Sequence, residues 1–177
     1  GEQDMQVSEA VASRRSVREF LDKPVDKALL ERILTKAQNA PSGGNTQPWN
    51  AVMATGEPLK KLLEAVAEVV PQGAAAHKPE YNIYPPELDG RYKDSRFGVG
   101  EAMYAALDIP RDNKMARLMW FARNFRAFDA PILMLIHTPR YMFFCGMAIG
   151  YRDPDAAVNN FPVARAPLGE VVSWEGF

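Results

Sequence analysis

Apolar residues recur every three or four positions in several stretches of the chain, which is the period of an amphipathic helix. Asp26 stands in the position of an N-cap before one stretch, and Pro41 stops that stretch at its other end. In the last of these stretches, residues 113–128, the apolar stripe is typical of a core-facing helix, although the aromatic residues next to it could also line a pocket for a flat aromatic ligand. The pattern predicts helices over residues 7–14, 27–37, 57–70, 94–107 and 113–128, the last with the stripe Met115, Leu118, Met119, Ala122 and Phe125 and the aromatic residues Trp120, Phe121 and Phe128.

Three shorter segments have the character of strands. Residues 132–136 and 143–149 are unbroken apolar runs bounded by Pro or Gly, as expected for strands buried on both faces, and residues 49–54 form a third segment. Residues 71–89 contain four prolines and little periodicity, which favours a long surface connection. Helices flanking a small buried sheet predict an α+β fold in a single domain over residues 1–177.

Composition narrows the classes of function. The chain has 177 residues, 47% of them hydrophobic, and a formal net charge of −1, so no excess of positive charge favours binding to nucleic acid or to an anionic membrane. Cys145 is the single cysteine and lies in an apolar run, which excludes an intrachain disulfide and favours a buried, inert thiol. No apolar run reaches the roughly 20 residues of a membrane span, and the first residues lack the character of a signal peptide. We therefore expect a cytoplasmic protein.

Two polar segments carry the candidate chemistry. The basic cluster Arg14-Arg15-Ser16-Val17-Arg18 offers fixed cations and a hydroxyl group that suit a phosphate and a polarised ring. The segment Ala40-Pro41-Ser42-Gly43-Gly44-Asn45-Thr46-Gln47-Pro48-Trp49-Asn50 offers glycines that permit close backbone approach, side-chain amides and an indole ring. Taken alone, the first suits the C-terminal end of a helix and the second suits an ordinary turn. Taken together, they indicate a flavin site.

The order and spacing of these segments resemble the FMN-dependent nitroreductase family, in which R-R-S-x-R is followed, after one helix, by A-P-S-x-x-N-x-Q-P-W. Residues 165–177 resemble the closing phosphate arginine and the extended tail of that family. The resemblance implies a central, mostly antiparallel sheet flanked by helices. It also implies a homodimer that exchanges a C-terminal arm and holds the flavin at the subunit interface.

The resemblance also assigns roles to residues. Arg14, Ser16 and Arg165, with Arg15 in the same cluster, match positions that hold the phosphate and ribityl end of FMN, and Arg18 matches a basic position near the pyrimidine edge, where its charge raises the reduction potential. The chain has no glycine-rich phosphate motif, so side chains must hold the phosphate. The second segment matches the loop that family members lend to the flavin of the neighbouring subunit. Its matching residues are Pro41, Ser42, Gly43 and Asn45, with Gln47 and Trp49 expected to brace the loop.

The function implied is transfer of hydride from NADH or NADPH through FMN to nitroaromatic or quinone-like acceptors, with ping-pong kinetics. The flavin carries the chemistry, so no catalytic side chain is expected. Neither His77 nor His137 has the partners of a metal site or a triad. Two alternatives stay open: a related FMN enzyme that reduces flavins, enones or halogenated compounds, and a flavin-binding or structural dimer without turnover.

The connection between the last two predicted strands departs from the family. Family members separate these strands by a long helical insert, whereas only Pro139-Arg140-Tyr141-Met142 lies between Thr138 and Phe143 here. Four residues are too few for a parallel crossover and lack the Asn-Gly or Asp-Gly pair that favours a tight hairpin. We therefore predict that residues are missing between about 139 and 144. In that case one pair of consecutive Cα atoms, most simply those of Met142 and Phe143, lies farther apart than the 3.8 Å or so of a trans peptide.

Overall fold

The computed structural model describes residues 5–73, 82, 84–138 and 143–175. Its centre is a three-stranded sheet in the order β1 (Asn50–Thr55), β2 (Ile132–His137) and β3 (Phe143–Ile149). Both pairs of strands are antiparallel, with Thr55 opposite Ile132 and Ile132 opposite Ile149. The predicted α+β fold with an antiparallel sheet is confirmed for these strands.

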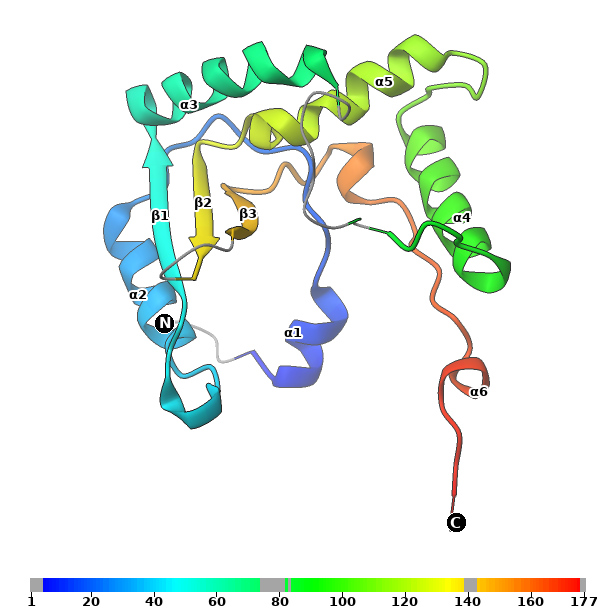
Figure 1. Ribbon diagram of the computed structural model, residues 1–177, viewed down its shortest axis with the longest axis horizontal. Helices are drawn as coiled ribbons and strands as arrows, with labels where there is room; N and C mark the ends of the chain where they lie inside the picture. Colours follow the sequence, from blue (N-terminus) through cyan, green and yellow to red (C-terminus); the bar gives the residue numbers. More distant parts are fainter. Residues whose placement is uncertain (1–4, 74–81, 83, 139–142, 176–177) are drawn as a thin grey trace.

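Figure 1 shows α2 beside the sheet and α3 across the end of β1, whereas α4 lies on the other side of the molecule, away from the strands. The Asp26 carboxylate accepts a hydrogen bond from the backbone N–H of Ala28 at 2.9 Å, which confirms the predicted N-cap. The Asn113 side chain caps a later helix in the same way, through the N–H of Ala116 at 3.1 Å. The helices are α1 (Val7–Ser13), α2 (Lys27–Ala37), α3 (Gly56–Val69), α4 (Gly90–Ala106), α5 (Lys114–Ala122) and α6 (Leu168–Val171), and the short 3₁₀ segments are η1 (Gly43–Asn45), η2 (Val70–Gln72), η4 (Arg123–Asp129) and η5 (Ala157–Asn159).

The helix predicted over residues 113–128 is shorter than expected. It ends as α5 at Ala122, and the chain then turns through Ala127, Phe128 and Asp129, whose φ angles are 50°, 54° and 59°. Arg123 holds this left-handed turn by donating to the Phe128 carbonyl at 3.5 Å and to the Asp129 carboxylate at 3.2 Å. Side-chain contacts that periodicity does not report therefore override the helical pattern.

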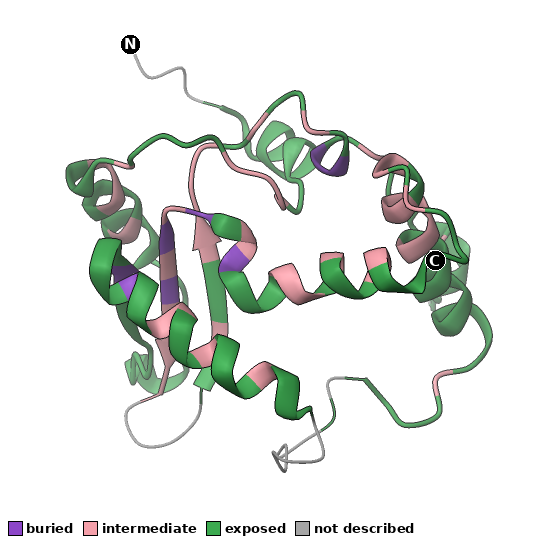
Figure 2. Cartoon of the chain, turned by 90° about the horizontal axis from the view of Figure 1, so that it is seen from above, coloured by how far each residue is buried: buried purple, intermediate pink, exposed green. Residues whose placement is uncertain are grey.

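Burial is concentrated where α3 and η4 meet the sheet (Figure 2). The prediction of strands buried on both faces is wrong for β3, because Phe143, Phe144 and Met147 are largely exposed. The prediction that the stripe of α5 packs in the core is also wrong, since Met115 and Met119 retain about two thirds of their accessible surface. The buried apolar residues of the described chain are Ala54, Leu59, Ala127, Ala130, Ile132, Met134 and Val158.

The accessible surface of the chain is large for its mass. A compact monomer of 19.7 kDa exposes about 8,600 Å² by the usual scaling of area with mass. This chain exposes 14279 Å². Large apolar side chains are exposed on α5, β3 and the C-terminal tail, among other elements, so the isolated chain leaves apolar surface available for a large interface.

The C-terminal tail runs away from the rest of the molecule (Figure 1). The extended tail that the resemblance implies is interrupted at α6, where residues 168–171 form one short helix. Pro167 presets the backbone at the N-cap of this helix, and Glu170 favours its first turn. The residues before it, 163–167, have no regular structure, so the tail is an arm interrupted by a single helical turn.

The connection between β2 and β3 lies at residues 139–142, outside the described residues, so the predicted separation of Cα atoms near Met142 and Phe143 is not tested. The antiparallel pairing of the two strands removes the need for a crossover. Among the helices of the described residues, none has the length and apolar character to cross a bilayer.

Candidate functional site

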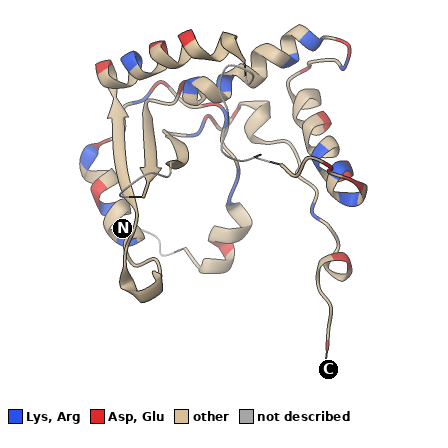
Figure 3. Ribbon diagram, in the orientation of Figure 1, with Lys and Arg blue, Asp and Glu red and all other residues tan. Residues whose placement is uncertain are grey.

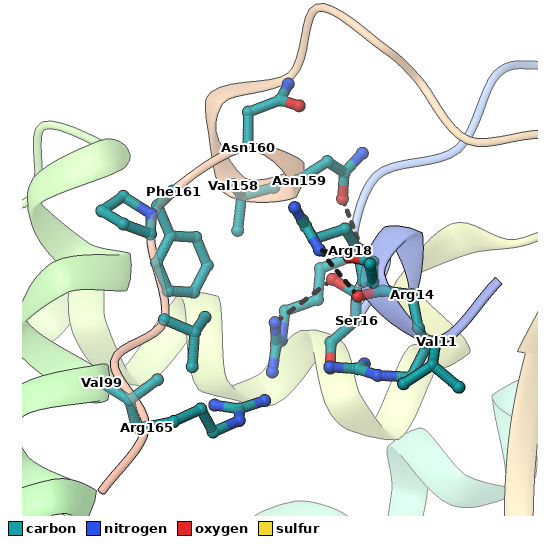
Figure 4. Close-up of a pocket in the computed structure, with 14 residues that line it drawn as sticks. Val11, Arg14, Ser16, Arg18, Val99, Val158, Asn159, Asn160, Phe161 and Arg165 are labelled. Atoms are coloured by element: carbon teal, nitrogen blue, oxygen red, sulfur yellow. Dashed lines mark hydrogen bonds between the residues drawn. The ribbon is translucent and has the colours of Figure 1, made fainter. Parts of the chain in front are cut away.

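A cavity of about 550 Å³ collects residues from both ends of the chain. Arg14, Ser16 and Arg18 form one side, and Arg165 projects from the segment that follows η5 on the other side (Figure 4). Val99 of α4 and Phe161 supply an apolar wall. The structure therefore brings together Arg14, Arg15, Ser16, Arg18 and Arg165, all five residues that the sequence analysis assigned to the phosphate, ribityl and pyrimidine positions.

The four arginines of this cavity have no carboxylate partner within ion-pair distance among the described residues. Arg15 instead donates to the Ala12 and Arg14 carbonyls, and Arg165 donates to the Ala164 carbonyl. Three arginines elsewhere, Arg117, Arg123 and Arg126, do pair with carboxylates, and Arg123 donates to both carboxylate oxygens of Glu19, at 2.6 and 3.1 Å. Four such cations around one cavity favour an anionic ligand. Figure 3 marks the Lys and Arg positions along the chain in blue.

Arg18 is the half-buried member of this group, and burial lowers the pKa of its guanidinium from the usual value. Its Nη1 lies 3.5 Å from the Ser16 carbonyl oxygen, and its backbone N–H donates to the side chain of buried Asn159 at 2.8 Å. Desolvating a cation without a carboxylate partner carries a cost that a bound anion or polar ring would offset.

The backbone beside Arg18 is fixed by contacts to distant parts of the chain. Glu19 pairs with Arg123, whose guanidinium stacks over the Trp120 ring at 4.6 Å. The N–H of Leu21 donates to the Tyr151 carbonyl at 2.8 Å, and the N–H of Asp153 donates to the Glu19 carbonyl at 3.2 Å. The two backbone bonds form an isolated antiparallel bridge between Phe20 and Arg152, and with the ion pair they hold an otherwise irregular segment in place.

The second predicted segment does not line this cavity. Its residues 43–45 form η1, and the φ angles of Gly44, Asn45 and Gln47 are 59°, 53° and 45°. The Ser42 hydroxyl accepts from the N–H of Gln47 at 2.9 Å, and the Gln47 side chain donates to the Asn45 carbonyl at 3.3 Å. Within one chain the structure therefore leaves Pro41, Ser42, Gly43, Asn45 and Gln47 apart from the arginines.

Two further cavities adjoin the sheet and the helices. One of about 420 Å³ shares Val99, Pro162 and Arg165 with the arginine cavity and extends along α4. Another of about 810 Å³ lies between α2, β1 and the start of α3, and its lining is mostly apolar. Across the part of the chain that the structure describes, no group of three or more His, Cys, Asp or Glu side chains is arranged to hold a metal ion.

The sequence analysis missed Asn159, which is 3% exposed and contacts the backbone of both Arg18 and Glu19. The only signal in the sequence is the pair Asn159-Asn160 just before Phe161-Pro162, which reads as a turn. Its partners lie 140 and 141 residues away, so local pattern could not reveal its role.

The sequence pattern of the nitroreductase family matches residues 11–161. The chain belongs to the nitroreductase family. The crystal structure of FMN and NADPH-dependent nitroreductase NfnB from Sphigopyxis sp. strain HMH is similar to this nitroreductase-family chain, with 39% identity and a TM-score of 0.92 over 98% of this chain and 100% of that one. The fold is therefore the nitroreductase fold, as the sequence predicted.

Several nitroreductases are also similar to this chain in sequence. Nitrobenzene nitroreductase of Ectopseudomonas oleovorans is 33% identical over 76% of this chain, which spans only 59% of the length of that relative. A 4-nitrobenzoate reductase of Pseudomonas putida is 34% identical over 94% of each chain. That alignment has 217 positions and exceeds the 177 residues of this chain by 40, so the relative has segments with no counterpart here.

Proposed function

We propose that this nitroreductase-family protein is an FMN-dependent oxidoreductase that transfers hydride from NADH or NADPH through FMN to nitroaromatic or quinone-like acceptors. The observation that carries the proposal is the cavity lined by four arginines that no carboxylate of the described residues pairs with. Relatives named as nitrobenzene and 4-nitrobenzoate reductases, and a similar structure named as FMN- and NADPH-dependent, support the same activity.

The residues of the cavity fit an anionic cofactor. Arg14, Ser16 and Arg165 would hold the phosphate and ribityl chain, with Arg15 adding positive charge at the end of α1. Arg18 would lie by the pyrimidine edge, where a desolvated cation raises the reduction potential. FMN, when bound, supplies the hydride chemistry, so we expect no acid or nucleophile from the protein and ping-pong kinetics.

The site is proposed to be complete only in a homodimer. The loop Pro41–Gln47, with Ser42, Gly43 and Asn45, lies away from the arginine cavity of its own chain and would reach the cofactor of the neighbouring subunit. The large exposed surface and the apolar residues of the C-terminal arm support a large interface between copies. A cytoplasmic location stays a prediction.

The test of function is a pair of measurements on the purified protein. Yellow colour with absorbance in the flavin region is expected, and a colourless protein that does not take up added FMN would contradict the cofactor assignment. Oxidation of NADH or NADPH should then depend on added nitrobenzene. A yellow protein that reduces enones or free flavin, but no nitroarene, would favour the related FMN reductases instead, and one without any turnover would favour a flavin-binding dimer.

Replacing Arg18 with alanine should leave the flavin bound but lower its reduction potential. The reason is the loss of a half-buried positive charge beside the ring, while the phosphate contacts remain. Reductive titration with a reference dye measures the potential. A potential equal to that of the unaltered protein would show that Arg18 does not act on the flavin.

We also propose that the natural polypeptide has residues between about 139 and 144 that this sequence lacks. The longer alignment with the Pseudomonas putida relative and the uncovered face of β3 support this. Trypsin cuts after Arg126, Arg140 and Arg152, so a continuous chain yields two peptides, of residues 127–140 and 141–152. We expect peptide mapping of the natural protein to lack at least one of them, and detection of both would show a shortened connection.

A further inference from the structure

Asn159 joins the two segments that supply the arginine cavity. It ends η5, six residues before Arg165, and its side chain reaches the chain at Arg18 and Glu19. Figure 4 shows it on the wall of the cavity, directed toward Arg18. It is buried, with 3% of its surface exposed, in a region where most polar side chains face solvent.

The amide of Asn159 uses its full hydrogen-bonding capacity. Its Oδ1 accepts from the N–H of Arg18 at 2.8 Å and from the N–H of Glu19 at 3.2 Å. Its Nδ2 donates to the Glu19 carbonyl at 2.8 Å and to the Asp153 carbonyl at 2.9 Å. Only a side chain with both an acceptor and two donors satisfies these four backbone groups together.

Arg18 depends on this amide for its position. Residues 14–19 have no regular secondary structure, so the N–H of Arg18 has no ladder to join. Its guanidinium has no carboxylate partner among the described residues, and its Nη1 makes a long contact of 3.5 Å to the Ser16 carbonyl. The backbone bond to Asn159, at 2.8 Å, is therefore the shorter of these two contacts and fixes where the Arg18 backbone enters the cavity.

We infer that Asn159 is a positioning residue for the flavin site, which acts by holding the Arg18 backbone so that the guanidinium lies against the ring. This inference rests on the proposed FMN-dependent function. A positioning role differs from a purely structural one in a measurable way. If Asn159 acts through Arg18, the effect of its loss on the flavin potential should disappear once the Arg18 charge has been removed.

The experiment is a double-mutant cycle read by the reduction potential of bound FMN. The variants are Asn159→Ala, Arg18→Ala and the double variant. We expect Asn159→Ala to lower the potential in the same direction as Arg18→Ala, and to cause no further lowering in the Arg18→Ala background. Like Arg18→Ala, Asn159→Ala should leave FMN bound, which fluorescence titration of the apoprotein measures.

The matched control is Asn113→Ala. Asn113 also accepts a hydrogen bond from a backbone N–H, but it caps α5 away from the arginine cavity. Its loss should lower the melting temperature without changing the potential or the affinity for FMN. Equal potentials in the Asn159→Ala and unaltered proteins, or a shift that persists in the Arg18→Ala background, would overturn the inference.

Hydrogen exchange tests the same inference without a variant. In the unaltered protein, the backbone amides of Arg18 and Glu19 should exchange hydrogen many times more slowly than amides of an unstructured chain, although both residues lie outside helices and strands. Fast exchange at both would overturn the inference even if Asn159→Ala does not fold. Failure of the unaltered protein to bind FMN would instead refute the proposed function, and the exchange rates would still decide whether Asn159 holds this backbone.

Discussion

Deleting residues 168–177 is expected to give monomers or aggregates that hold no flavin. In the single chain the tail leaves the body of the molecule, and Leu168, Val171 and Trp174 each expose more than half of their surface. Exposed apolar side chains this close together favour association with a second copy, because burying them stabilises the dimer by about 25 cal/mol per Å² of apolar surface. Light scattering coupled to size exclusion, with absorbance recorded in the flavin region, measures mass and flavin content together.

A point substitution separates the role of the arm from a general loss of stability. Val171→Asp should place a charge in the proposed interface and shift the protein toward monomers, as the deletion does. Glu170→Ala, on the same short helix, removes an exposed charge and should leave the dimer intact. A monomer that retains a full complement of flavin, from either the deletion or Val171→Asp, would contradict the shared-site proposal.

Local signals predicted most elements of the fold. The Asp26 cap and the apolar period over residues 27–37 depend on neighbours within a few positions, and both are found in the structure. The end of α5 at Ala122 was missed, because it depends on contacts that Arg123 makes with Glu19 and Asp129. The exposure of β3 was missed because an unbroken apolar run indicates that a strand must be covered, and does not say whether its own chain covers it.

The residues of the candidate site also fall into those that the sequence predicted and those that it could not. Arg14, Ser16, Arg18 and Arg165 were selected by their resemblance to a family, and the structure places them around one cavity although about 150 residues separate the first from the last. The loop at Ser42 lies elsewhere in the chain, so its part in the site depends on a partner that one sequence does not describe. Asn159 was missed because its four hydrogen bonds are visible only once the chain has folded.

Replacing Arg165 with alanine is expected to weaken FMN binding about 10- to 150-fold. Arg165 is the cation that the C-terminal segment contributes to the cavity, and a hydrogen bond to a charged group contributes about 1.5–3 kcal/mol. Because its proposed partner is the phosphate, the loss should fall on FMN and spare riboflavin, which lacks that group. Fluorescence titration of the apoprotein with each flavin measures the two affinities.

Arg96→Ala is the control, since Arg96 is an exposed arginine of α4 that stacks over the Tyr84 ring at 4.1 Å and does not line the arginine cavity. Arg96→Ala should change neither affinity. This result would show that the weaker FMN binding of Arg165→Ala does not come merely from the loss of one positive charge on the protein. Arg165→Lys should recover part of the affinity, because lysine keeps the charge but not the paired donors of a guanidinium. Equal weakening for FMN and riboflavin in Arg165→Ala would place Arg165 beside another part of the cofactor, and unchanged affinity for both would remove it from the site.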